Sequence, residues 1–132
     1  MKYCDTNFFI NAILGDKSIT SFISRSVKGE FTICTSSITW DELVWALKKS
    51  YNYQLGIDSG RMFLNIPKLI HLNLNKEIIN NAQNFIEFYK IRPKDAIHVA
   101  TALANGITEI ISDDSDFDKV KEIKRVSISE IR

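Results

Sequence analysis

Long hydrophobic runs are missing from this sequence. No apolar stretch among its 132 residues approaches the roughly 20 residues that are needed to cross a bilayer. Residues 1–5 contain no apolar signal-peptide core and reach an acid almost at once. We therefore expect a protein that is not exported, makes no membrane contact and stays in the cytoplasm.

Cysteine is almost as scarce. Cys4 and Cys34 are the only two cysteines, and each lies in an apolar run typical of a strand. We expect two buried thiols in a reducing compartment, since nothing in the sequence points to a disulfide or a metal-binding pair. His71 and His98 have neither the spacing nor the cysteine partners of a zinc site, and we expect structural roles for both.

Several common catalytic signatures and a large excess of charge are also absent. The five glycines are scattered, so there is no glycine-rich phosphate loop, and no Ser-His-Asp or Cys-His pattern is present. A net charge of +1 excludes a strongly electropositive nucleic-acid binder but allows a local basic rim. Candidates for that rim are Arg92 and Lys94, together with Lys48, Lys49 and Lys90. Solvated helix ends and turns are the alternative explanation for each of these side chains.

What the sequence does contain is the pattern of one α/β domain over residues 1–132. Its length and its 45% hydrophobic content suit a single domain with its own core. We expect strands at residues 2–4, 31–35, 69–74, 109–112 and 125–128, and helices at residues 8–14, 19–27, 40–51, 57–64, 76–89 and 93–104. Short strands separated by helices, without hairpin turn signals, predict a small, mainly parallel sheet covered on both faces.

Four acids occupy matching places in this pattern. Asp5 follows the first strand, Glu42 lies in the first turn of the helix after the second strand, and Asp114 follows the strand at 109–112. In a parallel sheet the strand carboxyl ends and the following helix starts share one edge, where ligands bind. Asp95 joins this edge only if the helix at 76–89 runs back along the sheet.

Each acid also has an explanation that needs no ligand. Asp5 and Asp95 stand at helix starts, where an acid caps the helix or complements its dipole. Glu42 has capping-box spacing from Thr39, and the acids at residues 113–116 suit a turn before a short helix. These explanations do not account for the apolar stripes beside the acids, which place them at the border of the core.

Taken together, the acids favour a metal site over four separate caps. Clustered carboxylates repel one another and raise each other's pKa values, and a bound cation removes that penalty. Carboxylate oxygens suit hard divalent ions, so Mg²⁺ or Mn²⁺ is the expected cofactor.

Four motifs resemble those of the PIN-domain family, and within it the VapC-type ribonuclease toxins. The motifs are Cys4-Asp5-Thr6-Asn7, Thr39-x-x-Glu42-Leu43, Asp95-Ala96-x-His98-x-Ala100-Thr101-Ala102-Leu103 and Ser112-Asp113-Asp114-Ser115-Asp116-Phe117. Each motif alone is weak, but their order and separations from residue 2 to residue 127 are specific. The resemblance implies a three-layer α/β/α sandwich with a small central parallel sheet and an acidic pocket for one or two metal ions.

The resemblance also implies roles for individual residues. Asp5, Glu42, Asp95 and Asp114 match the family's metal-coordinating acids, and Asn7 and Ser112 match polar residues beside the ions. In the last motif Ser112 and Asp113 replace the usual Thr and Asn. This departure leaves open whether Asp113 joins the site and whether Asp116 helps to hold a second ion.

The activity implied is metal-dependent endonucleolytic cleavage of RNA by a toxin that forms a homodimer and is inhibited by a small antitoxin. Arg92 and Lys94 are then expected to hold flanking RNA phosphates. Two alternatives stay open. One is a phosphatase with Asp5 as nucleophile, although Asn7 stands where a second Asp is expected and no catalytic Lys is evident. The other is a non-catalytic RNA-binding or scaffold module.

Overall fold

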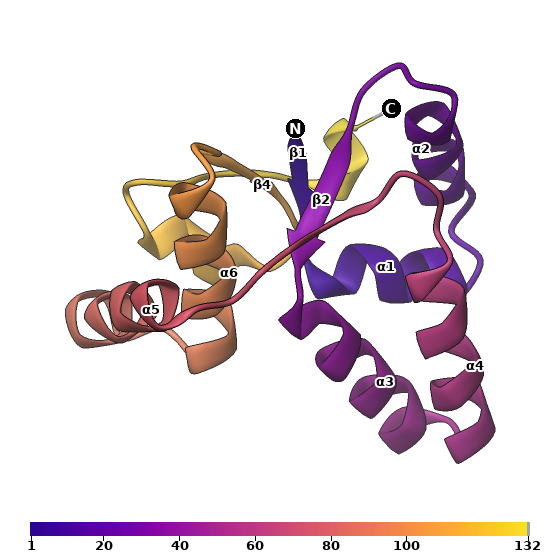
Figure 1. Ribbon diagram of the computed structural model, residues 1–132, viewed down its shortest axis with the longest axis horizontal. Coiled ribbons are helices and arrows are strands. Elements are labelled where there is room, and N and C mark those ends of the chain that lie inside the picture. The colour runs from indigo at the N-terminus through magenta and orange to yellow at the C-terminus, as the bar shows by residue number, and fades with distance from the viewer. Residues whose placement is uncertain (132) are drawn as a thin grey trace.

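The computed structural model describes residues 1–131 and contains one five-stranded parallel sheet (Figure 1). The strands are β1 (Lys2–Cys4), β2 (Ile33–Ser36), β3 (Ile70–Leu72), β4 (Glu109–Ile111) and β5 (Lys124–Val126). Their order is β3-β2-β1-β4-β5, and every neighbouring pair is parallel. The chain therefore winds outward in both directions from β1, and the gap between β1 and β4 is the point where ligands bind in such sheets.

The helices follow the predicted order closely. They are α1 (Thr6–Ile13), α2 (Lys17–Val27), α3 (Ile38–Ser50), α4 (Tyr53–Leu64), α5 (Lys76–Tyr89) and α6 (Pro93–Ala104), with short 3₁₀ helices at Ser115–Lys119 and Ile128–Glu130. The helix expected at residues 57–64 begins earlier, because the side chain of Asn52 accepts a hydrogen bond from the Leu55 N–H at 2.8 Å and caps α4. Within residues 1–131 no helix is both long and apolar enough to span a membrane.

Two hydrophobic cores lie on opposite faces of the sheet. Successive strand residues point to opposite sides, so Tyr3 packs with α5 and α6 whereas Cys4 packs with α1 to α4. Ile110 and Ile111 on β4 divide in the same way. The helices therefore form the two outer layers of the predicted α/β/α sandwich (Figure 1). Both cysteines are buried and free, as the sequence indicated.

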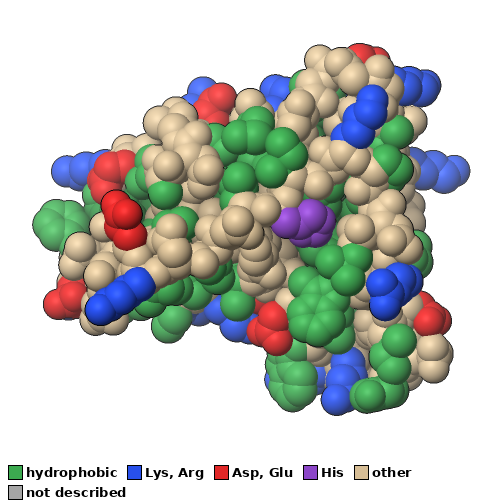
Figure 2. Space-filling model, in the orientation of Figure 1, with side chains coloured by type: hydrophobic (Ala, Val, Ile, Leu, Met, Phe, Trp, Pro, Cys, Tyr) green, Lys and Arg blue, Asp and Glu red, His purple; other side chains and the backbone are tan. Residues whose placement is uncertain are grey.

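The pair of helices α3 and α4 forms a projecting arm with a hydrophobic outer surface. The two helices approach closely because Gly56 and Gly60 face α3; a Cβ at Gly60 would lie 2.8 Å from Val44 Cγ2. Figure 2 shows hydrophobic side chains over this arm. Trp40 and Trp45 of α3 are 45% and 54% exposed, so neither tryptophan is part of the core.

Candidate active site

Asp5 lies between the end of β1 and the start of α1 and is buried. Its Oδ1 accepts a hydrogen bond from the Phe8 N–H at 3.2 Å, so Asp5 does cap α1. Its other oxygen, Oδ2, accepts a short hydrogen bond from the Ser112 hydroxyl, which lies just beyond β4. Asp5 is therefore both the N-cap of α1 and part of the candidate site. The hydrogen bond from Ser112 links the end of β4 to the end of β1.

Burial raises the pKa of Asp5 to about 6, although the hydrogen bond from Ser112 and the nearby His98 oppose this change. Repulsion from Asp114 adds to it. Burial likewise raises the pKa of Asp95 above its usual range, against the opposing effect of Arg92. Both carboxyl groups are thus costly to ionise without a compensating positive charge.

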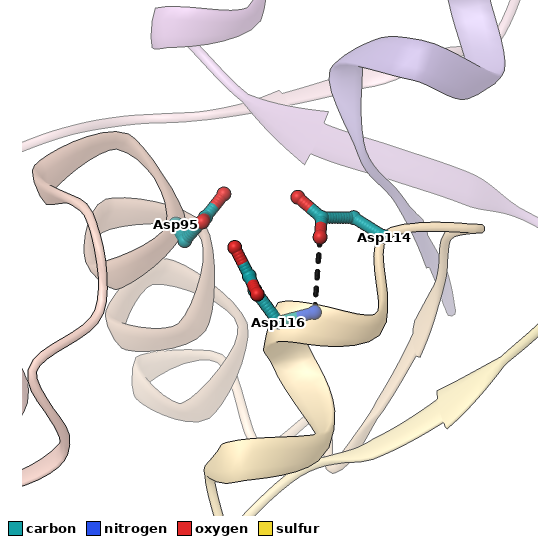
Figure 3. Close-up of side chains that lie close together, drawn as sticks. All are labelled: Asp95, Asp114 and Asp116. Atoms are coloured by element: carbon teal, nitrogen blue, oxygen red, sulfur yellow. Dashed lines mark hydrogen bonds between the residues drawn. The ribbon is translucent and has the colours of Figure 1, made fainter.

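Asp95, Asp114 and Asp116 converge in front of the sheet edge, each with a carboxylate oxygen within 4.8 Å of the others (Figure 3). Asp95 lies in the first turn of α6, which reaches this edge because Lys90 ends α5 in a left-handed conformation. The Asp114 side chain caps the 3₁₀ helix by accepting the Asp116 N–H at 2.9 Å. The structure therefore brings Asp95 to the common edge, as the sequence argument required.

Asp113 points elsewhere. Its Oδ1 accepts a hydrogen bond from the Ile128 N–H at 2.8 Å and so holds the segment after β5. The acid run at residues 113–116 thus divides in two. Asp114 and Asp116 belong to the acidic cluster, whereas the Asp113 carboxylate contacts the Ile128 N–H outside it.

Arg92 lies directly on the acidic cluster. Its Nε is 3.2 Å from Asp95 Oδ2, and its Nη2 is 2.9 Å from Asp114 Oδ2 and 3.9 Å from Asp116 Oδ2. The side chain is still 67% exposed. The family resemblance implies that Arg92 holds an RNA phosphate; in this structure its guanidinium also offsets the repulsion among three acids.

Glu42 approaches from α3. Its Oε1 accepts hydrogen bonds from the Thr6 hydroxyl at 3.0 Å and from His98 Nε2 at 2.7 Å. Burial alone would raise the pKa of Glu42, but the hydrogen bonds from His98 and Thr6 outweigh it and lower that pKa. The predicted capping box is not formed, because α3 begins at Ile38 and the Thr39 hydroxyl pairs with that of Thr35 at 2.7 Å.

His98 and Thr6 are the functional neighbours that sequence reasoning did not assign. His98 follows Asp95 by three residues, which places both side chains on one face of α6. That spacing was a usable signal, but it did not show whether this face meets the pocket or the sheet. Thr6 follows Asp5 directly and gave no signal of its own.

These residues surround one hollow of about 570 Å³. It is lined by Asp5, Glu42, Asp95 and Asp114, by Asn7, Thr6 and His98, by the apolar Ile10, Trp45, Ala46 and Pro93, and by Arg92 and Lys94. Asp116 belongs to the three-acid cluster at its border. The hollow thus combines four predicted acids with an exposed indole and a basic rim.

Comparisons with known proteins match this chain to one family and one fold. A model of the PIN domain matches residues 2–123 of the chain. Ribonuclease VapC6 of Methanocaldococcus jannaschii is 25% identical over 145 residues, covering 92% of this chain and 94% of the relative. Solved structures with the same fold include DNA-bound VapBC from Salmonella typhimurium (18% identity, 97% and 98% of the two chains, TM-score 0.77). Another is VapC20 from Mycobacterium tuberculosis, described as a Sarcin-Ricin loop cleaving toxin (15% identity, 89% and 93%, TM-score 0.72).

The raised pKa of Asp5 leads to a prediction about stability without metal. The folded-state pKa of about 6 exceeds the unfolded value of about 3.9, so Asp5 contributes stability below pH 4 that is lost as pH rises through 6. This loss corresponds to roughly 3 kcal/mol of unfolding free energy. Asp5→Asn avoids the ionisation, and should be more stable than wild type at pH 7 in EDTA by urea unfolding.

The matched control for this comparison is Asp113→Asn, which makes the same change outside the cluster and keeps an acceptor for the Ile128 N–H. It should give no comparable gain. An advantage of Asp5→Asn that does not grow between pH 4 and pH 7 would contradict the assignment.

Proposed function

This chain belongs to the PIN-domain family, and on that premise we propose that it is a metal-dependent endoribonuclease acting as the toxin of a toxin–antitoxin pair. The observation that carries the proposal is the single hollow at the carboxyl edge of the parallel sheet, which Asp5, Glu42, Asp95 and Asp114 line together. The relative named Ribonuclease VapC6 supports a nuclease. RNA is the proposed substrate.

The donor set suits a hard divalent ion. All five acidic side chains offer carboxylate oxygens, which Mg²⁺ and Mn²⁺ prefer, and no cysteine lines the hollow. Asp5, Glu42, Asp95 and Asp114, with Asp116 at the border, would hold the ion. When bound, it supplies an activated water and positive charge for phosphodiester hydrolysis.

The chain's own residues prepare the site in distinct ways. Ser112 and the Phe8 N–H hold Asp5 in one orientation, and Ser112 also accepts the Asp114 N–H at 2.9 Å. Asn7 is exposed in the hollow, where its amide is available to a bound phosphate or water. Arg92 contacts carboxylate oxygens of Asp95 and Asp114 that a bound metal ion would also use. Metal binding would therefore release the guanidinium for contact with an RNA phosphate.

RNA would enter along the basic and aromatic wall of the hollow. Lys94 is exposed at the rim and Trp45 presents an indole that is 54% exposed. Unpaired bases stack on aromatic side chains, whereas bases inside a duplex are not available for this contact. The wall therefore favours a single-stranded segment or loop.

An antitoxin and a second copy of the chain are the proposed protein partners. The solved structures with this fold include VapBC from Salmonella typhimurium. A small apolar groove of about 160 Å³ between α1, α2 and α4, lined by Phe9, Ile13, Ile23 and Met62 among others, suits an apolar segment of an antitoxin. Exposed hydrophobic side chains of α4, such as Tyr53 and Ile57, suit the contact between two copies.

Cleavage of structured and single-stranded RNAs tests the central proposal. Wild type should cut with Mg²⁺ or Mn²⁺ and not with EDTA, and Asp5→Asn or Asp95→Asn should reduce the rate roughly 100-fold or more, since even indirect contacts to a metal ligand cost 10–100-fold. Asp113→Asn should retain activity because Asp113 lies outside the cluster. No cutting by folded, antitoxin-free wild type with either metal would instead favour a phosphatase or a silent module.

Substitutions of the two basic residues at the hollow should differ in their effects on metal binding and on RNA binding. Lys94→Gln should weaken RNA binding and lower the slope of log affinity against log salt by about 1, because one phosphate contact is lost. Arg92→Gln should weaken RNA binding but tighten Mn²⁺ binding, since it removes a competing cation from the acids. Lys28→Gln, outside the hollow, is the control; equal Mn²⁺ affinity of Arg92→Gln and wild type would refute the competition.

The stacking role of Trp45 can be tested by RNA binding in the Asp5→Asn background. Trp45→Ala should weaken binding of single-stranded RNA by about tenfold, the order expected for one stacked base. Trp40→Ala is the matched control, because Trp40 lies on the same helix and is similarly exposed but does not line the hollow. Equal losses in the two variants would show that Trp45 makes no specific contact.

A further inference from the structure

We infer that Tyr3 and His98 form a positioning chain that orients the Glu42 carboxylate and leaves one of its oxygens free for a cation. The inference rests on the proposed metal-dependent function and adds two positioning residues to it. Neither residue belongs to the four acids on which the proposal was built.

The chain consists of two short contacts in series. The Tyr3 hydroxyl is 2.7 Å from His98 Nδ1, and His98 Nε2 is 2.7 Å from Glu42 Oε1. The rings of Tyr3 and His98 meet edge to face at 5.8 Å between centroids. Thr6 closes the arrangement, because its hydroxyl lies 3.2 Å from His98 Nε2 and donates to the same Glu42 oxygen.

The direction of these hydrogen bonds follows from what each group is able to do. A carboxylate only accepts, so His98 Nε2 carries the proton that is shared with Glu42. When the imidazole is neutral, Nδ1 accepts and the Tyr3 hydroxyl donates to it. Burial raises the pKa of Tyr3 well above its ordinary value, which keeps that donor protonated.

Burial makes the chain rigid. Tyr3 is fully buried and His98 is 2% exposed, so water does not compete for either contact. A buried histidine is usually satisfied by any convenient partner. Here both ring nitrogens of His98 have a partner, and the two contacts connect Tyr3 in the core with Glu42 at the wall of the hollow.

The two carboxylate oxygens of Glu42 therefore differ in their hydrogen bonding. Oε1 accepts both Thr6 and His98, whereas Oε2 has no hydrogen bond to any residue in the described range 1–131. Because Glu42 lines the hollow, Oε2 is the atom left for a cation. Residues that orient metal ligands in this way commonly contribute 10–100-fold to metal affinity or activity.

The chain also ties together the elements that carry three of the acids. Tyr3 is on β1, which leads into Asp5; His98 is on α6 with Asp95; Glu42 is on α3. The contacts span 95 and 56 residues of sequence. Positioning of Glu42 is thus coupled to the same strand and helix that set the places of Asp5 and Asp95.

Mn²⁺ titration of the metal-free protein by calorimetry tests the inference without relying on cleavage. Tyr3→Phe removes only the hydroxyl and should lower Mn²⁺ affinity by roughly tenfold, and His98→Leu should lower it by roughly 10–100-fold. Adding Tyr3→Phe to His98→Leu should cause no further loss, because Tyr3 acts only through His98. A merely structural role would not give this non-additive cycle.

The matched control is Thr101→Val, which removes a buried hydroxyl from the same helix that bonds only to the Ile97 carbonyl. It should lower stability without changing Mn²⁺ affinity. His98→Gln, which keeps a donor amide, should recover part of the affinity lost in His98→Leu. If His98→Leu does not fold, the comparison of Mn²⁺ affinity between Tyr3→Phe and Thr101→Val is the deciding test.

The outcomes separate this inference from the proposed function. If wild type binds Mn²⁺ and cuts RNA while Tyr3→Phe binds the metal as wild type does, the positioning chain is wrong and the nuclease stands. Additive losses in the double variant would also overturn it. If folded wild type neither binds Mn²⁺ nor cuts RNA, the proposed function fails and this inference fails with it.

Discussion

Carboxylates that repel one another are gathered at one edge of the sheet, and the polar contacts around them are arranged to offset that repulsion. A parallel sheet gathers the ends of its strands, and here those ends carry acids. Burial raises the pKa values of Asp5 and Asp95, so ionisation at neutral pH requires compensation. Much of the polar structure near the edge consists of donors that supply this compensation.

The compensation has two layers that differ in burial. The inner acids, Asp5 and Glu42, are held by buried donors, among them Ser112 and His98, which are fixed by packing. The outer acids face an exposed guanidinium, that of Arg92. The buried donors fix the orientation of the inner carboxylates, whereas water has access to the contacts of the exposed Arg92 side chain. The arrangement therefore suits inner oxygens that are ready for an ion and an outer site where a metal exchanges with a side chain.

Function and stability are opposed in this design. Each feature that makes the hollow suitable for a cation, including burial and close spacing of like charges, disfavours the folded protein without one. The helix-capping roles of Asp5 and Asp114 soften the conflict, because the same carboxylates that repel each other also satisfy helix N–H groups. Asp5 and Asp114 therefore cap helices at the same edge where the proposed metal site lies, and the two roles do not exclude each other.

Local patterns of apolar residues, caps and strand ends are enough to predict the order of elements, the parallel sheet and the edge where the acids meet. They do not predict that Asp113 turns away, that Arg92 lies on the acids, or that His98 contacts both Tyr3 and Glu42. These contacts join residues that are far apart along the chain. Local spacing sets which face of an element a side chain occupies. The packing of elements that are distant in sequence decides which residue that side chain contacts.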